Sequence, residues 1–185
     1  MEKIILVIIA IAIAYLFTPV SVKGSLYVVT QGAAVIPMPN TPIKVYSLKN
    51  FRQSLYQKQS FANQECMGLP DKTETELDYL KNGPDHHNAK ANYELIVSCE
   101  TATLINEINM PLVETIQTNK DGEFSFSRSR LDDLVLIAEG KRRVGAETEQ
   151  YLWLLVIPKE GLLSQKLEIN NGNLVNDIKI QAIQL

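Results

Sequence analysis

The sequence predicts a mainly β protein, a β-sandwich that is interrupted by helices and preceded by an apolar N-terminal segment. Three observations predict this class: short alternating segments in both halves of the chain, helical spacing between residues 48 and 110, and an unbroken apolar run near Met1. The 185 residues suffice for one domain plus an appendage. We therefore expect residues 22–185 to form one sandwich, interrupted by the insertion 48–110.

The N-terminal segment, residues 1–21, is typical of either a signal peptide or a membrane anchor. Residues 4–17 carry no charge and follow Lys3, as in both kinds of segment. The run is short for a bilayer span, but the best small-residue cleavage pattern, Val22-Lys23-Gly24, would trim the first strand. Both alternatives stay open: secretion after cleavage, or anchoring to the inner membrane through residues 4–20. Each predicts an exported, periplasmic or otherwise extracytoplasmic protein.

The clearest β signal lies at Leu112–Ser127. Two alternating runs flank the turn Asn119-Lys120-Asp121-Gly122, and an Asp-Gly pair between such runs is typical of a hairpin. We therefore expect two strands that pair directly with one another.

The remaining strands follow from composition. Val22–Thr30 and Ile43–Ser47 are β-branched and aromatic, with a proline-rich link between them. Leu131–Gly140 and Tyr151–Pro158 are continuously apolar, so both of their faces should be covered, by the inserted helices or by a partner. We expect a polar loop at 144–150 and a closing strand at 174–182. The expected core residues are Phe124, Phe126, Leu136, Trp153, Leu155 and Ile180.

Three helices are expected in the insertion. Residues 48–64 place apolar side chains at helical spacing, and Thr73 and Glu76 have the spacing of a capping box for a helix at 73–81. A third, longer helix at about 88–108 would carry one apolar stripe that includes Cys99. The insertion is thus mainly helical, with loops between the three helices.

The two cysteines, Cys66 and Cys99, form a candidate disulfide because an exported protein meets an oxidising compartment. The bridge would close a loop of about 34 residues and contribute about 3 to 4 kcal/mol in the chain-entropy model. The alternative is a small buried hydrophobe at Cys99 and a loop thiol at Cys66.

Metal-type ligands gather only at Asp85-His86-His87. Adjacent side chains diverge, and no H-E-x-x-H, G-x-S-x-G or phosphate-loop motif occurs. We expect a solvated loop there, no cofactor and no enzymatic activity, with a metal-dependent hydrolase as a remote alternative. A net charge of -3 without a basic stripe excludes nucleic acid as a partner.

The β segments resemble the carboxypeptidase regulatory-like, or transthyretin-like, family. The resemblance rests on VKGSLYVVT leading into PIKVYS, on TIQTNKDGEFSFS at the family's T-x-x-D-G-x-F hairpin, and on DDLVLIAEG after it. It covers about 22–47 and 112–185 and leaves the insertion unmatched. In addition, YLWLLVIP followed by LEINNGNLV is similar to segments of exported bacterial proteins that carry such an insertion. The resemblance implies a Greek-key sandwich of about seven strands and a non-catalytic module for folding support, adhesion or ligand contact.

Two functions follow as hypotheses. The first is a non-enzymatic extracytoplasmic module for binding or structural support. The second is a membrane-anchored subunit of an envelope assembly, which docks an unknown protein partner through the insertion or through the apolar strand 151–157.

Overall fold

A computed structural model of the chain describes residues 14–66, 68–69, 71–83, 87–106, 108–159 and 164–175. The chain divides into two compact units. Met1–Lys49 and Pro111–Leu174 form the first, which contains the strands, and Asn50–Met110 with Val175–Leu185 form the second, which contains most of the helical residues. We call them the sandwich unit and the helical unit and describe each by itself.

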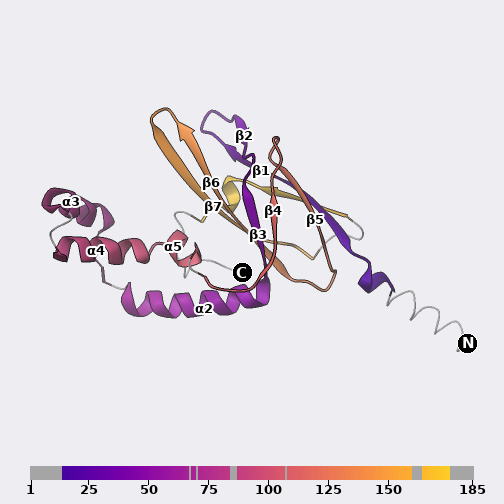
Figure 1. Cartoon of the computed structure of the whole chain (residues 1–185), viewed down its shortest axis with the longest axis horizontal. Coiled ribbons are helices and arrows are strands. Elements are labelled where there is room, and N and C mark those ends of the chain that lie inside the picture. Colours follow the sequence, from indigo (N-terminus) through magenta and orange to yellow (C-terminus); the bar gives the residue numbers. More distant parts are fainter. Residues whose placement is uncertain are drawn as a thin grey trace, which may run out of the picture. The chain divides into compact units, whose positions relative to one another are not determined.

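Eight strands build the sandwich unit in the described part of the chain, and they form two four-stranded sheets (Figure 1). The first sheet has β5, β1 and β8 side by side, with β2 also paired to β1, and the second has the order β4-β3-β6-β7. The strands are β1 (Val20–Val29), β2 (Val35–Pro37), β3 (Pro42–Ser47), β4 (Leu112–Gln117), β5 (Glu123–Arg128), β6 (Leu134–Val144), β7 (Glu147–Val156) and β8 (Ser164–Ile169). The class expected from the sequence, a mainly β sandwich with inserted helices, agrees with this architecture.

The expected hairpin at Leu112–Ser127 is wrong. Its two strands exist, but β4 pairs with β3 in one sheet and β5 pairs with β1 in the other. The connection crosses between the sheets: the Asn119 side chain accepts hydrogen bonds from the backbone N–H groups of Asp121 and Glu123, both at 2.9 Å, and Gly122 has φ +76°. Alternation encodes which face of a strand is buried and not which strand is its partner.

A second crossing, residues 38–41, lies beside the first. The Thr118 hydroxyl donates to the Met38 carbonyl at 2.6 Å and accepts from the Thr41 N–H at 2.8 Å. The Thr118 N–H in turn donates to the Thr41 carbonyl at 3.1 Å, and both threonines are buried. These bonds satisfy polar groups that would otherwise be buried without a partner, so the two crossings hold each other in place.

The core of the sandwich unit lies between the two sheets. Trp153 is fully buried, Phe124, Phe126 and Leu136 are buried with it, and Leu155 packs against them half-buried. Gly24 makes room for one of the rings, since a Cβ there would lie 2.3 Å from Cζ of Phe124. Ile180, also expected in the core, lies outside the described residues.

Strands β6 and β7 bury residues on both faces, as their continuous apolar runs predict. Leu134 and Leu136 belong to the core, whereas Val135 and Ile137 lie on the opposite face and are buried too. The expected polar loop at 144–150 is wrong, because the pairing continues to Val144 and Glu147. Gly145, with φ +63°, allows this tight turn, in which left-handed backbone is needed.

Two features of the first sheet were not predicted from the sequence. β2 was not expected, and β8 runs parallel to β1, with Gly24 opposite Leu167. After β8 the chain makes a 3₁₀ turn at Asn171–Asn173, where the Asn171 side chain accepts from the Val29 N–H at 2.7 Å and donates to the Val29 carbonyl at 2.9 Å. Leu174 forms a single bridge to Trp153, and most of the expected closing strand lies outside the described residues.

Residues 14–17 form the described end of the N-terminal segment and are helical. The Arg130 guanidinium lies 4.0 Å from the centre of the Tyr15 ring, and its Nε donates to the Tyr15 carbonyl at 3.0 Å. No helix among the described residues is long and apolar enough to cross a membrane.

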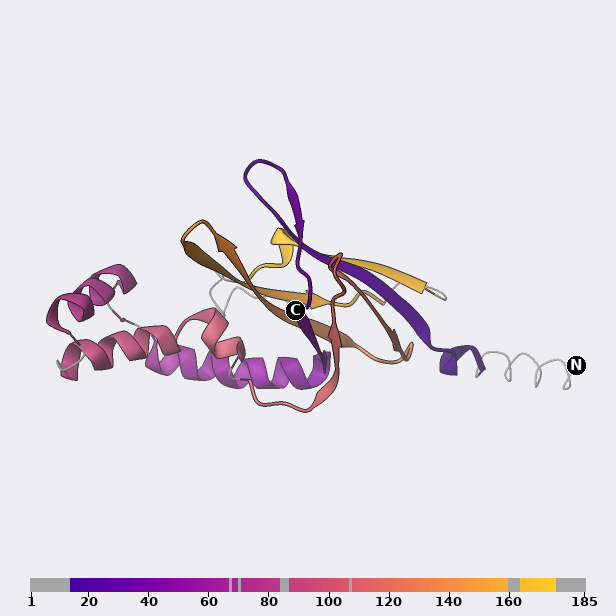
Figure 2. The same cartoon turned by 45° about the horizontal axis from the view of Figure 1, so that its top comes forward.

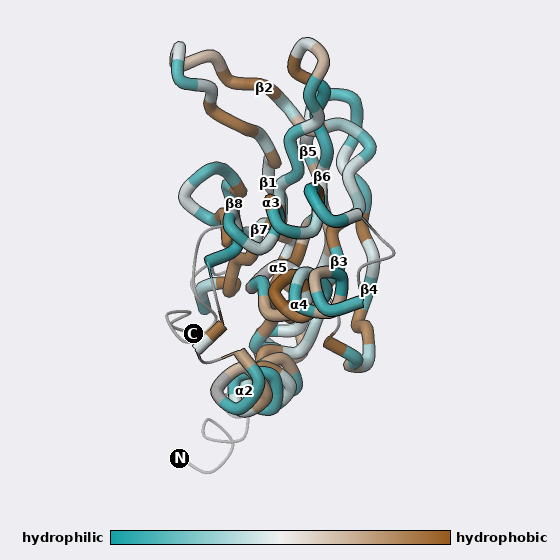
Figure 3. The backbone as a smooth tube through the Cα atoms, turned by 90° about the vertical axis from the view of Figure 1, so that its left-hand side faces the viewer, coloured by the Kyte–Doolittle hydropathy of each residue, from teal (hydrophilic) through white to brown (hydrophobic). Residues whose placement is uncertain are grey.

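The helices are α2 (Leu48–Glu65), α3 (Lys72–Asn82), α4 (His87–Ser98) and α5 (Thr101–Asn106). The first expected helix agrees with α2, along which Figure 3 shows hydrophilic and hydrophobic residues mixed. The cap of α3 is Asp71, whose carboxylate accepts from the N–H groups of Thr73 and Glu74, so the expected capping box is wrong. The expected third helix breaks at Cys99. There the backbone N–H groups of Cys99 and Glu100 donate hydrogen bonds to the carbonyls of Ile96 and Val97, three residues earlier in the chain.

Candidate functional site

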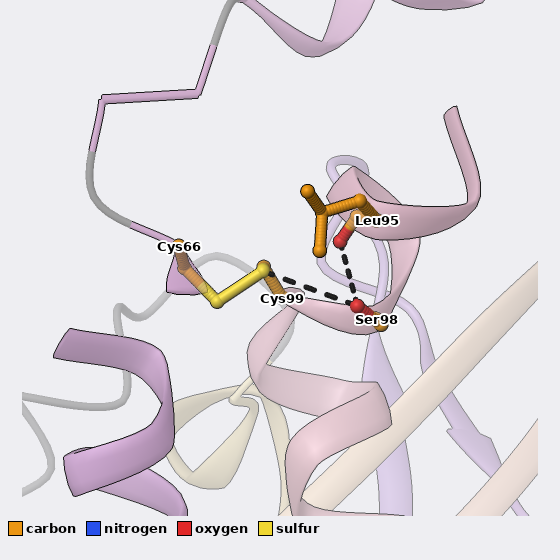
Figure 4. Close-up of a disulfide and its surroundings, with 4 residues drawn as sticks. All are labelled: Cys66, Leu95, Ser98 and Cys99. Atoms are coloured by element: carbon orange, nitrogen blue, oxygen red, sulfur yellow. Dashed lines mark hydrogen bonds between the residues drawn. A yellow bond between two sulfur atoms is a disulfide. The ribbon is translucent and has the colours of Figure 1, made fainter. Parts of the chain in front are cut away.

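A disulfide joins Cys66, at the end of α2, to Cys99, at the break between α4 and α5 (Figure 4). Their Cα atoms are 5.7 Å apart, within the usual range for a bridge. The neighbouring Ser98 hydroxyl donates to the Leu95 carbonyl at 2.7 Å. The pairing expected from the sequence is present, and the chain has no free cysteine.

The helices between the two cysteines form an antiparallel pair, α3 and α4, visible in Figures 1 and 2. The rings of Tyr79 and Tyr93 stack between them with centroids 4.9 Å apart. Lys72 forms an ion pair with Glu100, and the hydrogen bond to that carboxylate raises the pKa of Lys72, although partial burial opposes the shift. These polar and aromatic contacts orient the pair.

Little apolar surface of α3 and α4 is buried. In the described part of these helices, the buried residues are Thr75, Ala89 and Ile96. Leu77 is 49% exposed and Leu80 is 69% exposed. In the described part of the helical unit, four large apolar residues are exposed: Tyr56, Phe61, Leu77 and Leu80. Leu77 and Leu80 are three residues apart on α3 and so lie on the same side of the helix, and contiguous exposed apolar patches are where interaction sites occur.

A polar depression occupies the outer face of the first sheet. Its volume is about 840 Å³, and Lys23, Lys166 and Glu123 line it together with hydroxyl and amide side chains. The other polar residues lining it are Ser25, Gln117, Asn119, Ser125, Ser164 and Gln165. The alternation in β1, β5 and β8 places apolar residues in the core and leaves outside six of the lining residues: Lys23, Ser25, Glu123, Ser125, Ser164 and Lys166. This is the candidate binding site of the sandwich unit.

This depression was not predicted from the sequence. Alternation alone shows that Lys23 and Lys166 leave the buried face of their strands, which is the ordinary pattern of a solvated face. Their proximity depends on the parallel register of β1 and β8, in which Lys23 is opposite Lys166. No local sequence signal fixes the pairing of strands that lie more than a hundred residues apart.

The weak candidate metal site Asp85-His86-His87 lies largely outside the described residues and stays a prediction. His87 is the first residue of α4, whereas Asp85 and His86 lie outside the described residues. The described part of the chain contains no group of three or more metal-type ligands. The strand 151–157, expected as a docking surface, has only buried and half-buried residues.

Comparisons with known proteins give weak structural likenesses. No family model and no curated protein matches the sequence. A proposed carbohydrate-binding protein of Pseudomonas aeruginosa aligns with 84% of this chain and 90% of its own length, at 13% identity and a TM-score of 0.39. The SpaB basal pilin of Lactobacillus rhamnosus GG aligns with 83% of this chain and 98% of its own length, at 15% identity and a TM-score of 0.33.

A third likeness is to the pilus backbone protein RrgB of Streptococcus pneumoniae, at 10% identity and a TM-score of 0.23, over 83% of this chain and 41% of RrgB. Likeness at this level assigns neither a family nor a function, so the resemblance to the transthyretin-like family stays an expectation.

Proposed function

We propose that this chain is a non-enzymatic, extracytoplasmic β-sandwich module of the cell envelope, which binds a ligand or supports an assembly. The Cys66–Cys99 disulfide carries the proposal, because it uses both cysteines of the chain. Structural disulfides persist in oxidising compartments and are rare where glutathione and thioredoxin keep thiols reduced. The charge-free run at residues 4–17 agrees with export.

The first test is the intact mass and N-terminal sequence of the protein from membrane and soluble envelope fractions, alkylated with and without reductant. We expect no alkylation before reduction and two alkylated thiols afterwards. A start near Gly24 or Ser25 in the soluble fraction identifies a secreted or periplasmic module, and a start at Met1 in the membrane fraction identifies an anchored one. Free thiols before reduction, or recovery from the cytoplasm, would contradict the proposal.

A membrane-anchored subunit that docks a partner is the second candidate. The exposed apolar side chains of the helical unit favour it, with Leu80 69% exposed and Leu77 next to it at helical spacing. The docking would use the helical unit, because strand 151–157 is not exposed.

Cross-linking in intact cells tests this second candidate. We expect a cross-linked species that Leu77→Ser/Leu80→Ser removes. Leu112→Ser/Leu131→Ser is the matched control, since these leucines are 48% and 65% exposed in the sandwich unit. A native protein that gives no cross-linked partner, or equal losses in both variants, would rule this candidate out.

A further inference from the structure

Two lysines stand side by side on the outer face of the first sheet. Lys23 of β1 and Lys166 of β8 are register partners, so their side chains leave the same face of the sheet. Neighbouring strands lie about 4.8 Å apart, and both side chains are exposed. Like charges placed directly opposite one another repel. An anion bound between the two ammonium groups would reduce this repulsion.

Among the described residues, neither ammonium group of this pair has a carboxylate within 4.0 Å. The acidic residues of the next row across the sheet are held by neutral donors instead: the Glu123 carboxylate accepts from the Asn119 amide at 3.2 Å, and the Glu168 carboxylate accepts from the Tyr27 hydroxyl at 3.1 Å. The two ammonium groups can therefore form direct ion pairs with the carboxylate of another molecule.

The surroundings of the pair suit a hydroxyl-rich ligand. Ser125 is the register partner of Lys23 on β5, and Ser25 and Ser164 line the same depression. Hydroxyl side chains both donate and accept hydrogen bonds, as sugar hydroxyls do. The volume of about 840 Å³ lies in the range of ligand pockets.

We propose that this depression binds an acidic saccharide of the uronate type, with a sugar carboxylate between Lys23 and Lys166. Glu123 also lines the depression, two residues along β5 from Ser125 and thus about 7 Å away along the strand. A densely charged polyanion would be repelled by that carboxylate, whereas a neutral sugar hydroxyl can donate a hydrogen bond to it. The proposal rests on the binding role proposed above, and it requires a mature chain that retains Lys23.

Titration calorimetry on the full chain at low salt tests the assignment, with trigalacturonate as the acidic probe. Galactotriose is the neutral counterpart, and inorganic phosphate represents a free oxyanion. We expect saturable binding of trigalacturonate, weakened at least about tenfold in Lys23→Gln/Lys166→Gln. Lys120→Gln/Lys141→Gln removes the same charge from exposed positions outside the lysine pair and should bind like the native protein. The unfolding transition of Trp153 fluorescence checks that every variant is folded.

Four outcomes would overturn the proposal. The first two are that trigalacturonate does not bind saturably, or that it binds Lys23→Gln/Lys166→Gln as tightly as it binds the native protein. The third is that both double-lysine variants bind trigalacturonate equally weakly. The fourth is that galactotriose or phosphate binds as tightly as trigalacturonate. A mature start near Gly24 would remove Lys23 and is therefore a fifth such outcome, although it would support export. None of the other four alters the alkylation pattern, so a failure here is distinguishable from a failure of the proposed disulfide.

Discussion

The sandwich unit and the α3–α4 pair of the helical unit are held together by different means. The sandwich unit has a continuous apolar core that runs from Val22 to Ile169 in sequence and includes the only tryptophan, Trp153. The α3–α4 pair of the helical unit buries only Thr75, Ala89 and Ile96 in its described part, and a disulfide closes the loop that contains it. A small core is rarely sufficient on its own, and a covalent link compensates for it.

This difference makes the two units separately measurable. Trp153 is fully buried in the sandwich unit, so its fluorescence reports the unfolding of that unit. Far-ultraviolet circular dichroism at the helical minimum reports mainly α2 to α5. A change that weakens one means of stabilisation should therefore move one signal and leave the other in place.

The largest expected effect is the loss of a core ring. Phe124→Ala removes a buried side chain that packs over Gly24, and we expect a loss of about 3 to 5 kcal/mol in the free energy of unfolding. Denaturant unfolding followed by Trp153 fluorescence measures it. Phe61→Ala is the matched control, because Phe61 is 40% exposed on α2 and its loss should cost about 0.5 kcal/mol or less. Similar costs at both positions would show that the sandwich core is not the main source of stability.

Removal of the disulfide should have the next largest effect. We expect it in the circular dichroism of the helices and not in the fluorescence of Trp153. Cys66 and Cys99 are 33 residues apart in sequence, and opening their loop should cost about 3 to 4 kcal/mol. We expect Cys66→Ser/Cys99→Ser to lose helical dichroism at a lower temperature, while the Trp153 transition stays in place. Reductant added to this variant should change nothing further. An equal shift of both signals would mean that the two units unfold as one.

The third effect concerns the polar contacts between the two sheet crossings. Thr118→Val keeps the shape of the side chain but leaves the buried Thr41 N–H without its acceptor, at an expected cost of about 1 to 3 kcal/mol. Thr115→Val makes the same exchange at an exposed position of β4 and should be nearly neutral. Thermal unfolding followed by Trp153 fluorescence compares them. A neutral Thr118→Val would show that the apolar core alone defines the crossings.

The sequence predicted well which face of a strand is buried and which segments are strands or helices. It predicted poorly which strands pair with one another. Phe124 and Phe126 alternate with Ser125 and Ser127, and this period of two is sufficient to place the phenyl rings inside. The same pattern suits a hairpin and a crossing between sheets equally, so the partner of β5 was assigned wrongly. Pairing is decided by contacts between residues far apart in the chain, such as Val22 with Phe126.

Three side chains, Lys23, Lys166 and Arg128, show why the candidate site and some buried polar contacts were harder to predict. Lys23 and Lys166 meet only because β1 and β8 are parallel and in one register. Arg128 continues the inward row of β5 and is 5% exposed, although arginine usually lies at the surface. Its guanidinium donates to the Asp132 and Pro158 carbonyls at 3.1 and 3.2 Å, partners that exist only after folding. Local patterns do not encode contacts of this kind.

The smallest expected effect is the contribution of the Lys72–Glu100 ion pair to the helical unit. The hydrogen bond to the Glu100 carboxylate raises the pKa of Lys72 above its ordinary value of 10.5. The folded protein therefore holds this proton more tightly than the unfolded chain. The stabilisation is fully present below about pH 10 and is lost as the pH rises through the raised pKa. Because the Lys72 side chain is 54% exposed, solvent screens the pair, and about 0.2 to 1 kcal/mol is expected.

Thermal unfolding of the helical dichroism from about pH 9 to about pH 12 measures this contribution. We expect the native protein to lose more stability over that range than Lys72→Met, which has already lost the pair, while the two proteins become alike at the alkaline end. Lys90→Met is the matched control for the loss of one surface ammonium group. Lys90 lies on the exposed face of α4, and its Nζ is 3.8 Å from Oε1 of Glu94. If Lys72→Met and the native protein lose stability in parallel, the ion pair does not stabilise the α3–α4 pair, and the disulfide and the stacked tyrosines remain as its main supports.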